Sequence, residues 1–263
     1  MMNISRQAFY KYRNKVIKAK LEEEVIVELV NQVRRSLPRL GGRKLYHLLE
    51  DDLSKLPVKI GRDKFFAILR RNGLLVEPLR QYVKTTNSHH IFRIYTNLVK
   101  ELTVDQPNKV FVSDITYIRL AEGFCYLFLV TDLCSRKIVG FDLSMSLATE
   151  GAIAAMKMAL KQVAETKELI HHSDRGIQYC SGEYVELLQS KKIKLSMGET
   201  GNPYDNAIAE RVNGILKTEF LLNATFTDYK TALKATREAI SSYNNLRPHM
   251  SLEYMTPAQR YAA

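Results

Sequence analysis

The feature that most constrains the fold is a run of three β-strand patterns between residues 110 and 143. Residues 110–118 (VFVSDITYI), 124–131 (FCYLFLVT) and 137–143 (KIVGFDL) are rich in β-branched and aromatic side chains, as strands are. Only short turns separate them, and consecutive strands joined by short turns pair as an antiparallel meander. A sheet therefore forms the centre of this part of the chain.

After the meander, helical and strand patterns alternate. The expected elements are a helix over 149–164 capped by Thr149, a strand over 168–172, a helix over 181–190 capped by Ser181, a strand over 193–196, a helix within 201–220, and a helix over 228–243 capped by Thr227. Residues 243–257 are expected to form a polar loop. This order predicts an α/β (mixed α+β) fold with a five-stranded mixed sheet flanked by helices, and it resembles a ribonuclease H-like domain.

The helix expected within residues 201–220 carries two different stripes. At about 100° per residue, the apolar stripe comprises Ala209, Val212, Leu216 and Phe220, and the polar stripe comprises Asn206, Glu210, Asn213 and Lys217. The apolar stripe indicates the face that packs on the core. On the neighbouring face, a carboxylate with a lysine two turns later suits a metal ion held beside a polyanion.

Positive charge is concentrated in the first 100 residues. They hold 21 of the 39 Lys and Arg residues but only 9 of the 28 Asp and Glu residues, a net charge of +12 against −1 for the rest of the chain. This distribution suggests a nucleic-acid-binding region attached to a nearly neutral domain. A basic surface that is simply solvated is the alternative.

Three short helices are expected in this basic region, over residues 21–36, 43–54 and 62–72, with Gly73 as the C-cap of the last. Residues 1–20 are polar and basic and read as the tail of a recognition helix that begins upstream. Candidate DNA contacts on the helices are Arg43, Lys44, Arg62 and Lys64. A helix-turn-helix DNA-binding unit is one interpretation, and a three-helix bundle with charged outer faces is the other.

These patterns predict three parts: a basic helical DNA-binding domain over 1–75, a linker over 76–108, and an α/β core with its C-terminal helix and tail over 109–263. The linker shows little periodicity. It contains the pair His89 and His90, which no CxxC motif accompanies. We therefore expect this pair to be exposed or to face DNA, and not to bind zinc.

Cysteine usage and hydropathy point to a reducing compartment. Cys125, Cys134 and Cys180 are odd in number and widely spaced, so they fit neither a disulfide framework nor a zinc site. The chain has no run of 18 apolar residues, and its N-terminus lacks the apolar segment of a secretory signal. We therefore expect a cytoplasmic protein with no membrane partner.

Three acidic residues stand at positions from which they can meet. Asp114 lies in the middle of the first strand, Asp174 follows the fourth, and Glu210 lies on the helix after the fifth. The first and fourth strands are neighbours in such a fold, so Asp114 and Asp174 converge at one end of the sheet. An unpaired acid within a strand is costly unless it meets a cation or a metal. By contrast, we expect Asp132 to shape the turn after the second strand and Asp205 to lie at a helix start.

Three converging carboxylates suit phosphoryl transfer, because catalysis of this reaction depends mainly on positioning and charge stabilisation. Two Mg²⁺ ions about 3.5–4 Å apart activate the attacking oxygen and stabilise the leaving oxygen. Mg²⁺ prefers oxygen ligands, and a bound cation relieves the repulsion between carboxylates. We therefore predict that Asp114, Asp174 and Glu210 are both metal ligands and catalytic residues.

At these residues the chain resembles a known family, the orfB-type transposases of bacterial insertion sequences, whose DDE catalytic core is similar to retroviral integrase. The matching text is NKVFVSDITYI around Asp114, HSDRGIQYCS around Asp174, GNPYDNAIAERVNGILKTE around Glu210, and YNNLRPHMSL near the end. The 35 residues between the second and third acids also match, as does Lys217 seven positions after the third. LGGRKLYHLL and GRDKFFAILRRNGLL resemble the helical DNA-binding region that precedes this core. The resemblance covers nearly the whole chain.

The resemblance implies a transposase that uses two Mg²⁺ (or Mn²⁺) ions to cleave element ends in double-stranded DNA and to join the 3′-OH ends to another phosphodiester. It implies a homo-oligomer on DNA, a bacterial, nucleoid-associated location, and an upstream orfA-type partner or frameshift fusion, which the start at Met1-Met2 fits. Candidate DNA contacts in the core are Lys217, Arg211, Asn206, Arg175, His172 and Arg247. The alternative for His172 and Arg175 is a position around the metal ligands, and for Arg247 it is capping of carbonyl groups in the core.

One position departs from the family pattern. The family usually has Trp three residues before its first Asp, where this chain has Phe111, and the chain contains no Trp. An aromatic side chain is retained, so we expect a difference in packing and not a loss of activity. Two alternatives to a transposase stay open: a non-catalytic DNA-binding repressor of the same family, and a nuclease of the same fold that lacks strand transfer.

Overall fold

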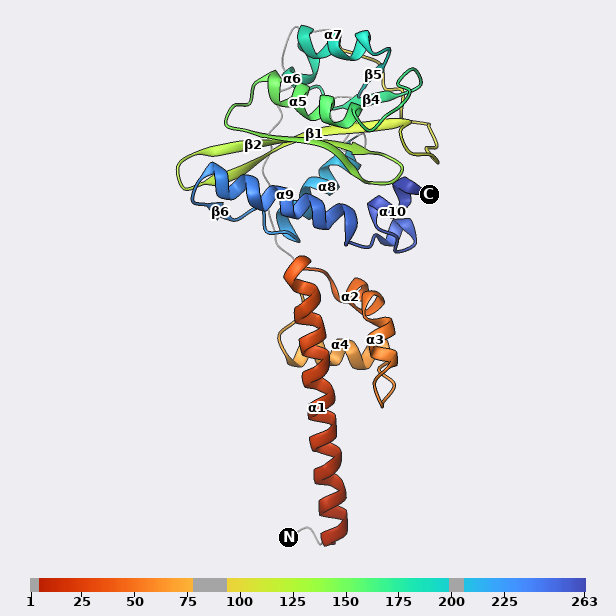
Figure 1. Cartoon of the computed structure of the whole chain (residues 1–263), viewed down its shortest axis with the longest axis vertical. Coiled ribbons are helices and arrows are strands. Elements are labelled where there is room, and N and C mark those ends of the chain that lie inside the picture. The colour runs from red at the N-terminus through yellow and green to blue at the C-terminus, as the bar shows by residue number, and fades with distance from the viewer. Residues whose placement is uncertain (1–4, 78–93, 199–205) are drawn as a thin grey trace. The chain divides into compact units, whose positions relative to one another are not determined.

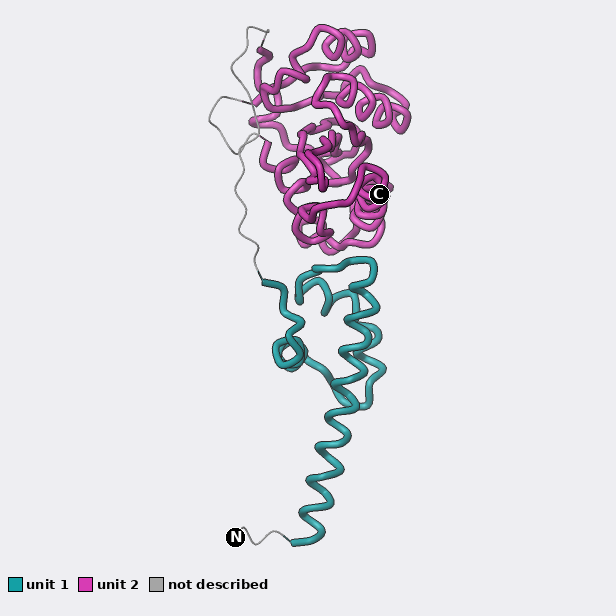
Figure 2. Tube along the Cα trace, turned by 90° about the vertical axis from the view of Figure 1, so that its left-hand side faces the viewer, with its two compact units in different colours: residues 1–78 teal, residues 79–263 magenta. Residues whose placement is uncertain are grey.

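The computed structural model describes residues 5–77, 94–198 and 206–263. The chain divides into two compact units, residues 1–78 (unit 1) and 79–263 (unit 2), shown in Figure 2. Residues 78–93 of the expected linker, including the pair His89-His90, lie outside the described residues, as does Asp205.

Over its described residues, 5–77, unit 1 contains four helices: α1 (Arg6–Ser36), α2 (Gly42–Leu48), α3 (Glu50–Ser54) and α4 (Arg62–Arg71). Its core is apolar and includes Ile26, Val30, Leu40, Leu45, Leu53, Phe65 and Leu69. The single helix predicted over 43–54 is broken at Leu49, whose backbone leaves the helical conformation before the acidic first turn of α3. The C-cap of α4 is Asn72, and the predicted Gly73 follows it with φ of +64°, so that Leu74 N–H donates to the carbonyl of Leu69 at 2.8 Å.

Helix α1 is much longer than the sequence pattern predicts. It begins at Arg6 and not at residue 21, with the Ser5 hydroxyl accepting a hydrogen bond from Ala8 N–H at 3.2 Å. No Gly or Pro interrupts the 31 residues, so nothing breaks the helix. The predicted helix started at residue 21 because the core contacts start there: Glu22 is the first buried residue of α1.

Unit 2 is built on a mixed sheet with the strand order β3-β2-β1-β4-β5, and a short β6 also pairs with β1. The strands are β1 (Val110–Leu120), β2 (Phe124–Asp132), β3 (Ile138–Ser144), β4 (Ile170–Ser173), β5 (Lys194–Met197) and β6 (Thr225–Phe226). The first three form the predicted antiparallel meander, and β4 runs parallel to β1. In the described part of unit 2, the two-residue β6, which the sequence pattern did not indicate, is added to the predicted five strands.

Helices cover both faces of the sheet, as Figure 1 shows. Helices α5 (Thr149–Leu160), α6 (Ile177–Cys180) and α7 (Gly182–Ser190) lie on one side, and α8 (Ala207–Thr218) and α9 (Tyr229–Asn245) lie on the other. The sheet is therefore the middle of three layers. Its two helical layers are supplied by segments before and after residue 200.

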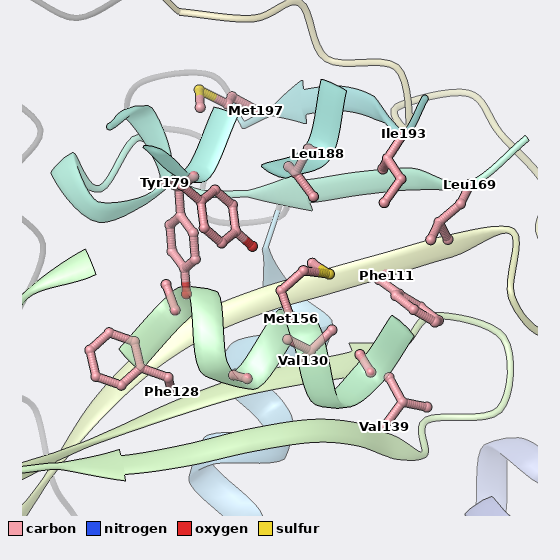
Figure 3. Close-up of a cluster of buried hydrophobic side chains, with 14 of the residues drawn as sticks. Phe111, Phe128, Val130, Val139, Met156, Leu169, Tyr179, Leu188, Ile193 and Met197 are labelled. Atoms are coloured by element: carbon pink, nitrogen blue, oxygen red, sulfur yellow. The ribbon is translucent and has the colours of Figure 1, made fainter. Parts of the chain in front are cut away.

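The core between the sheet and α5 is shown in Figure 3. Phe111, the aromatic residue in place of Trp, is fully buried there. Gly140 explains how closely β3 approaches α5: a Cβ at this position would lie 2.1 Å from the backbone oxygen of Ala155. Any larger residue would separate this strand from the helix.

Three predictions at the ends of elements need correction. Ala148, not Thr149, precedes α5, and Asp228, not Thr227, caps α9 by accepting from Thr231 N–H at 2.8 Å. The expected polar C-terminal loop contains a short 3₁₀ turn (Met250–Leu252) and a helix, α10 (Pro257–Ala262). Thr256 and Gln259 form a capping box at the start of α10, a signal that was readable in the sequence. Across the described parts of the chain, no helix combines the length and apolarity needed to cross a bilayer.

Candidate active site

Asp114 lies halfway along β1, on the strand face that packs against α8. Alternation along a strand places it on the same side as Val110 and Val112, and these two residues form a buried cluster with Ala209 of α8. The Asp114 side chain is only half-buried. One carboxylate is thus held on the central strand, facing the helix that carries Glu210.

Asp174 comes next to Asp114 because of the pairing between β1 and β4. The parallel register pairs Ser113 with Ser173, the last residue of β4, so the following residue leaves the sheet beside Asp114. One Asp174 oxygen, Oδ1, accepts a hydrogen bond from Gly176 N–H at 3.0 Å, which fixes the turn. The convergence expected from neighbouring first and fourth strands is therefore present in the sheet.

Helix α8 positions the third acid. Its apolar stripe is buried as predicted, with Ala209, Val212 and Leu216 each at most 3% exposed. Glu210 lies in the first turn of the helix and is exposed. Packing of the stripe on β1 therefore leaves the Glu210 carboxylate open to solvent at the same end of the sheet.

The three carboxylates are close enough to influence one another. Burial is the main cause that raises the pKa of Asp114 to about 7, and the negative charges of Asp174 and Glu210 add to it. Hydrogen bonds from Asn213 and from Ile115 N–H act in the opposite direction. Burial and the two neighbouring negative charges therefore disfavour the ionised form of Asp114, and a bound cation would favour it.

The donors at this site have the chemistry that a hard divalent cation needs, since carboxylate oxygens are its preferred ligands. Within residues 5–77, 94–198 and 206–263, no three His, Cys, Asp or Glu side chains are arranged to hold a metal ion as they stand. Repulsion between carboxylates opposes their close approach, and a bound cation relieves it. The residues fit a divalent cation that completes the site together with its substrate.

Asn213 is a residue of this site to which the sequence pattern assigned no task. It lies on α8 one turn after Glu210, and its Nδ2 donates to Asp114 Oδ2 at 2.7 Å. The side chain is 6% exposed, and its Oδ1 has no hydrogen-bond partner within the described structure. Asn213 therefore orients the Asp114 carboxylate directly. Its place on the polar stripe was the only signal in the sequence.

We expect Asn213→Ala to lower the rate of DNA cleavage about 10- to 100-fold, the usual cost of losing a residue that orients a metal ligand. Affinity for divalent cations should fall while DNA affinity stays the same. Single-turnover cleavage across a range of Mg²⁺ concentrations measures this. Gly214→Ala, an exposed change on the same helix with nothing within 4 Å of the new Cβ, is the control. Equal rates for both variants would contradict the role of Asn213.

The raised pKa of Asp114 also predicts a pH dependence of stability. A carboxyl group titrates near 3.9 in an unfolded chain and near 7 here, so the folded protein binds this proton more tightly. By linkage, the tighter proton binding adds to the free energy of unfolding. This contribution is fully present below about pH 4 and is lost as the pH rises to about 7. In EDTA, the melting temperature should therefore fall more steeply between pH 5 and pH 7.5 for the wild type than for Asp114→Asn. Added Mg²⁺ should stabilise the wild type most near pH 7.5. Parallel curves for the two proteins would contradict this.

Lys217 lies two turns after Glu210, near the same carboxylates. Its Nζ is 4.2 Å from the centre of the Tyr117 ring. Burial lowers the pKa of Lys217, and the negative charge of Asp114 opposes that effect. Among the described residues no carboxylate lies within ion-pair distance of this ammonium group. The ring therefore holds a half-buried cation beside the acids.

The structure corrects three of the DNA contacts expected in the core. His172 is fully buried in β4, with Nδ1 2.8 Å from Ser196 Oγ. Asn206 is 8% exposed and donates through Nδ2 to the Ser113 carbonyl at 3.3 Å. Arg247 is 2% exposed. Side chains buried in these positions are not available to DNA.

Arg247 instead joins α8 to the segment after α9. Its Nη2 and Nε donate to the two carboxylate oxygens of Glu219 at 2.6 and 2.9 Å. This two-pronged contact is the strongest geometry available to Arg. The residue closes the core, through a carboxylate and not through the carbonyl groups expected from the sequence.

The remaining predicted DNA contacts are exposed or half-buried, and Asp132 is buried in its turn. Arg211 is exposed on α8, while Arg175 is half-buried and donates through Nε to the Gly198 carbonyl at 2.8 Å. Asp132 is fully buried and accepts from Ser135 N–H and Oγ–H at 2.7 and 2.6 Å, which confirms its role in the turn. In unit 1, Arg43, Arg62 and Lys64 are exposed and Lys44 is half-buried.

The known proteins that this chain is similar to are integrase core domains and proteins of bacterial insertion sequences. Two models described as an integrase core domain match residues 104–203 and 191–257. An uncharacterized 31 kDa protein of insertion element IS600 from Shigella sonnei is 30% identical over 262 residues, covering 98% of this chain and 95% of that protein. Transposase InsF for insertion sequence IS3A from Escherichia coli (strain K12) is 31% identical over 227 residues, covering 86% of this chain and 77% of that protein.

Among solved structures, the chain is similar to a simian T-cell lymphotropic virus intasome in complex with PP2A regulatory subunit B56 gamma. The TM-score is 0.52 at 18% identity, over 85% of this chain and 75% of the matched one. At this identity the likeness shows the fold alone. Together with the mixed sheet and its two helical layers, it confirms the predicted ribonuclease H-like fold.

Proposed function

The chain belongs to the insertion-sequence transposases with an integrase core domain, and we propose that it cuts the ends of its element and joins them to new DNA with the help of divalent cations. Family membership makes it a DNA transposase, an enzyme of the polynucleotidyl transferase class. The proposal adds the reaction steps, the metal dependence and the residues that perform them.

The observation that carries the proposal is the proximity of three carboxylates from β1, the turn after β4, and α8. Asp174 and Glu210 both raise the pKa of Asp114, so all three act on one small region. They would hold two Mg²⁺ or Mn²⁺ ions, which when bound supply the positive charge that phosphodiester chemistry needs at the attacking and leaving oxygens. Asn213 keeps the Asp114 carboxylate in place.

The remaining residues of the site would position DNA. Lys217, held over the Tyr117 ring beside the acids, would bind a phosphate close to the bond that reacts. Arg211, exposed on the same helix, and Arg175, next to Asp174, would contact phosphates further along the strand. These contacts would orient the strand so that water attacks first, and the freed 3′-OH attacks a second phosphodiester afterwards.

Unit 1 would bind the ends of the element as a basic helical DNA-binding domain over residues 1–75, joined by a linker over 76–108 to the core at 109–263. Exposed cations on α2 and α4, including Arg43 and Arg62, support this assignment. Joining two ends requires them to be held together, so we expect a homo-oligomer on DNA at the bacterial nucleoid. An upstream orfA-type partner, free or fused by frameshifting, belongs to the same proposal.

A strand-transfer assay tests the proposal. The full chain is incubated with duplexes that carry the element's terminal sequences, with Mg²⁺ or with EDTA. We expect nicked ends and covalently joined products with Mg²⁺ and neither with EDTA. Nicked ends without joined products would indicate a nuclease of the same fold, and DNA binding without either product would indicate a repressor.

A further inference from the structure

The first half of α1, residues 6–21, stands apart from the rest of unit 1. We call it the α1 arm. Figures 1 and 2 show it projecting beyond the helices that form the core of this unit. Each residue of the arm is exposed, and α1 contributes its first buried side chains only from Glu22 onward. The arm therefore packs on nothing in the described part of its own unit.

The arm lacks the packing that stabilises most helices. Most helical stability in proteins comes from packing of an amphipathic face, and the sixteen residues of the arm are all exposed. The arm exposes large apolar side chains, with Phe9 at 55%, Tyr12 at 68% and Leu21 at 57% of their area. Exposed groups of this kind mark interaction surfaces. The chemistry of the arm indicates which partner.

The arm is strongly basic: it contains six Lys or Arg residues and no Asp or Glu. At about 100° per residue, these cations form two rows that lie on nearly opposite sides of the helix. The first row is Arg6, Arg13 and Lys20, and the second is Lys11, Lys15 and Lys18. Within the described structure, no cation of the arm has a carboxylate partner.

This arrangement disfavours an apolar partner. The first row runs between two apolar groups, one formed by Phe9, Tyr12 and Val16 and the other by Tyr10, Ile17 and Leu21. Burying those groups in a membrane or against another helix would bury the row of cations between them without counter-charges, which is costly. A second copy of the arm would also bring like charges together.

We propose that the α1 arm lies along the major groove of duplex DNA. The groove is about 12 Å wide and admits an α-helix, whose diameter with side chains is about 10–12 Å. Cation rows on opposite sides of the helix reach the phosphates on the two walls of the groove. The apolar side chains contact sugars and thymine methyl groups, as such groups do in the major groove. Sixteen residues span about 24 Å, roughly seven base pairs.

This inference rests on the proposed function, because it takes DNA as the partner, and it adds a contact that is separate from the cations of α2 and α4. It also explains why the helix continues so far beyond the core of unit 1. The second half of α1 anchors the helix through Ile26 and Val30, so the arm is held as a rigid extension.

The test replaces each row by glutamine in the full-length chain: Arg6→Gln/Arg13→Gln/Lys20→Gln for the first row and Lys11→Gln/Lys15→Gln/Lys18→Gln for the second. Glutamine keeps the helix propensity. Affinity for a mixed-sequence duplex is measured in EDTA over a range of salt concentrations. Affinity falls with salt, and each lost phosphate contact reduces the magnitude of the slope of log affinity against log salt by about 0.9. We expect each triple variant to reduce this magnitude by about 2–3. Each should also weaken binding more than tenfold at about 100 mM salt.

A triple variant of exposed lysines in unit 2, Lys157→Gln/Lys161→Gln/Lys167→Gln, is the matched control for net charge and should keep the wild-type slope. A slope that is unchanged in both row variants overturns the proposal. So does a change confined to self-association in sedimentation or to binding of anionic vesicles. The binding assay contains no metal, so it is independent of the proposed reaction. If the wild type joined no DNA but the row variants still showed a weaker salt dependence of binding, the proposed reaction would be refuted and the role of the arm would stand.

Discussion

Replacing Asp114 with asparagine is expected to abolish both cleavage and joining while leaving DNA affinity intact. Asn keeps the size of the side chain but removes the charge that a metal ion requires. Losing metal-assisted charge stabilisation costs several kcal/mol in the transition state, so the rate should fall at least about 1,000-fold. Single-turnover cleavage and equilibrium binding to the same duplex measure the two properties separately. Asp174→Asn and Glu210→Gln should behave alike.

The matched control is Asp142→Asn, which changes another half-buried acid of the same sheet, on β3. Burial raises the pKa of Asp142, but no neighbouring carboxylate contributes to that shift. This variant should therefore retain cleavage. Cleavage at the wild-type rate by Asp114→Asn, or equal losses in both variants, would show that the three-acid site is not the catalytic centre.

Replacing Arg247 with alanine is expected to cost stability and not DNA binding. The change leaves the Glu219 carboxylate, which is 22% exposed, without the guanidinium that lies against both its oxygens. Breaking a fully buried pair costs about 3–5 kcal/mol, and partial exposure of Glu219 reduces this to about 2–3 kcal/mol. For a unit of this size the melting temperature should fall by roughly 5–10 °C.

Arg211→Ala provides the opposite pattern for comparison, because Arg211 is exposed on α8. It should weaken DNA binding and leave the melting temperature within about 1–2 °C of the wild type. Thermal melts and binding curves below the melting range are recorded for both variants. If Arg247→Ala weakened DNA binding without lowering the melting temperature, the assignment of this residue to the core would be wrong.

The fold and the meeting of Asp114 with Asp174 were predictable because they depend on patterns that the sequence displays directly. Strand periodicity located β1, and the order of elements made β4 its neighbour. The apolar stripe of α8 set which face packs inward, so the side on which Glu210 lies followed from geometry. Each of these patterns is local in the sequence, and each determines one feature of the tertiary structure.

The environment of single polar residues was not predictable in the same way. His172 and Arg247 look like surface residues in the sequence, yet their partners, Ser196 and Glu219, are 24 and 28 residues away. A hydrogen bond between such residues depends on the register of strands and on how helices pack. The length of α1 was missed for the opposite reason, because its first half has no core contact to produce a recognisable apolar face.

Binding of Mn²⁺ to the full chain on its DNA end, followed by electron paramagnetic resonance, tests the central claim most directly. Mn²⁺ takes the same oxygen ligands as Mg²⁺ and is itself the spectroscopic probe. We expect the wild type to bind Mn²⁺ and Asp114→Asn, Asp174→Asn and Glu210→Gln each to bind it at least tenfold more weakly, with Asp142→Asn unchanged. Wild-type Mn²⁺ affinity in all three site variants would contradict the assignment of these carboxylates as the metal ligands.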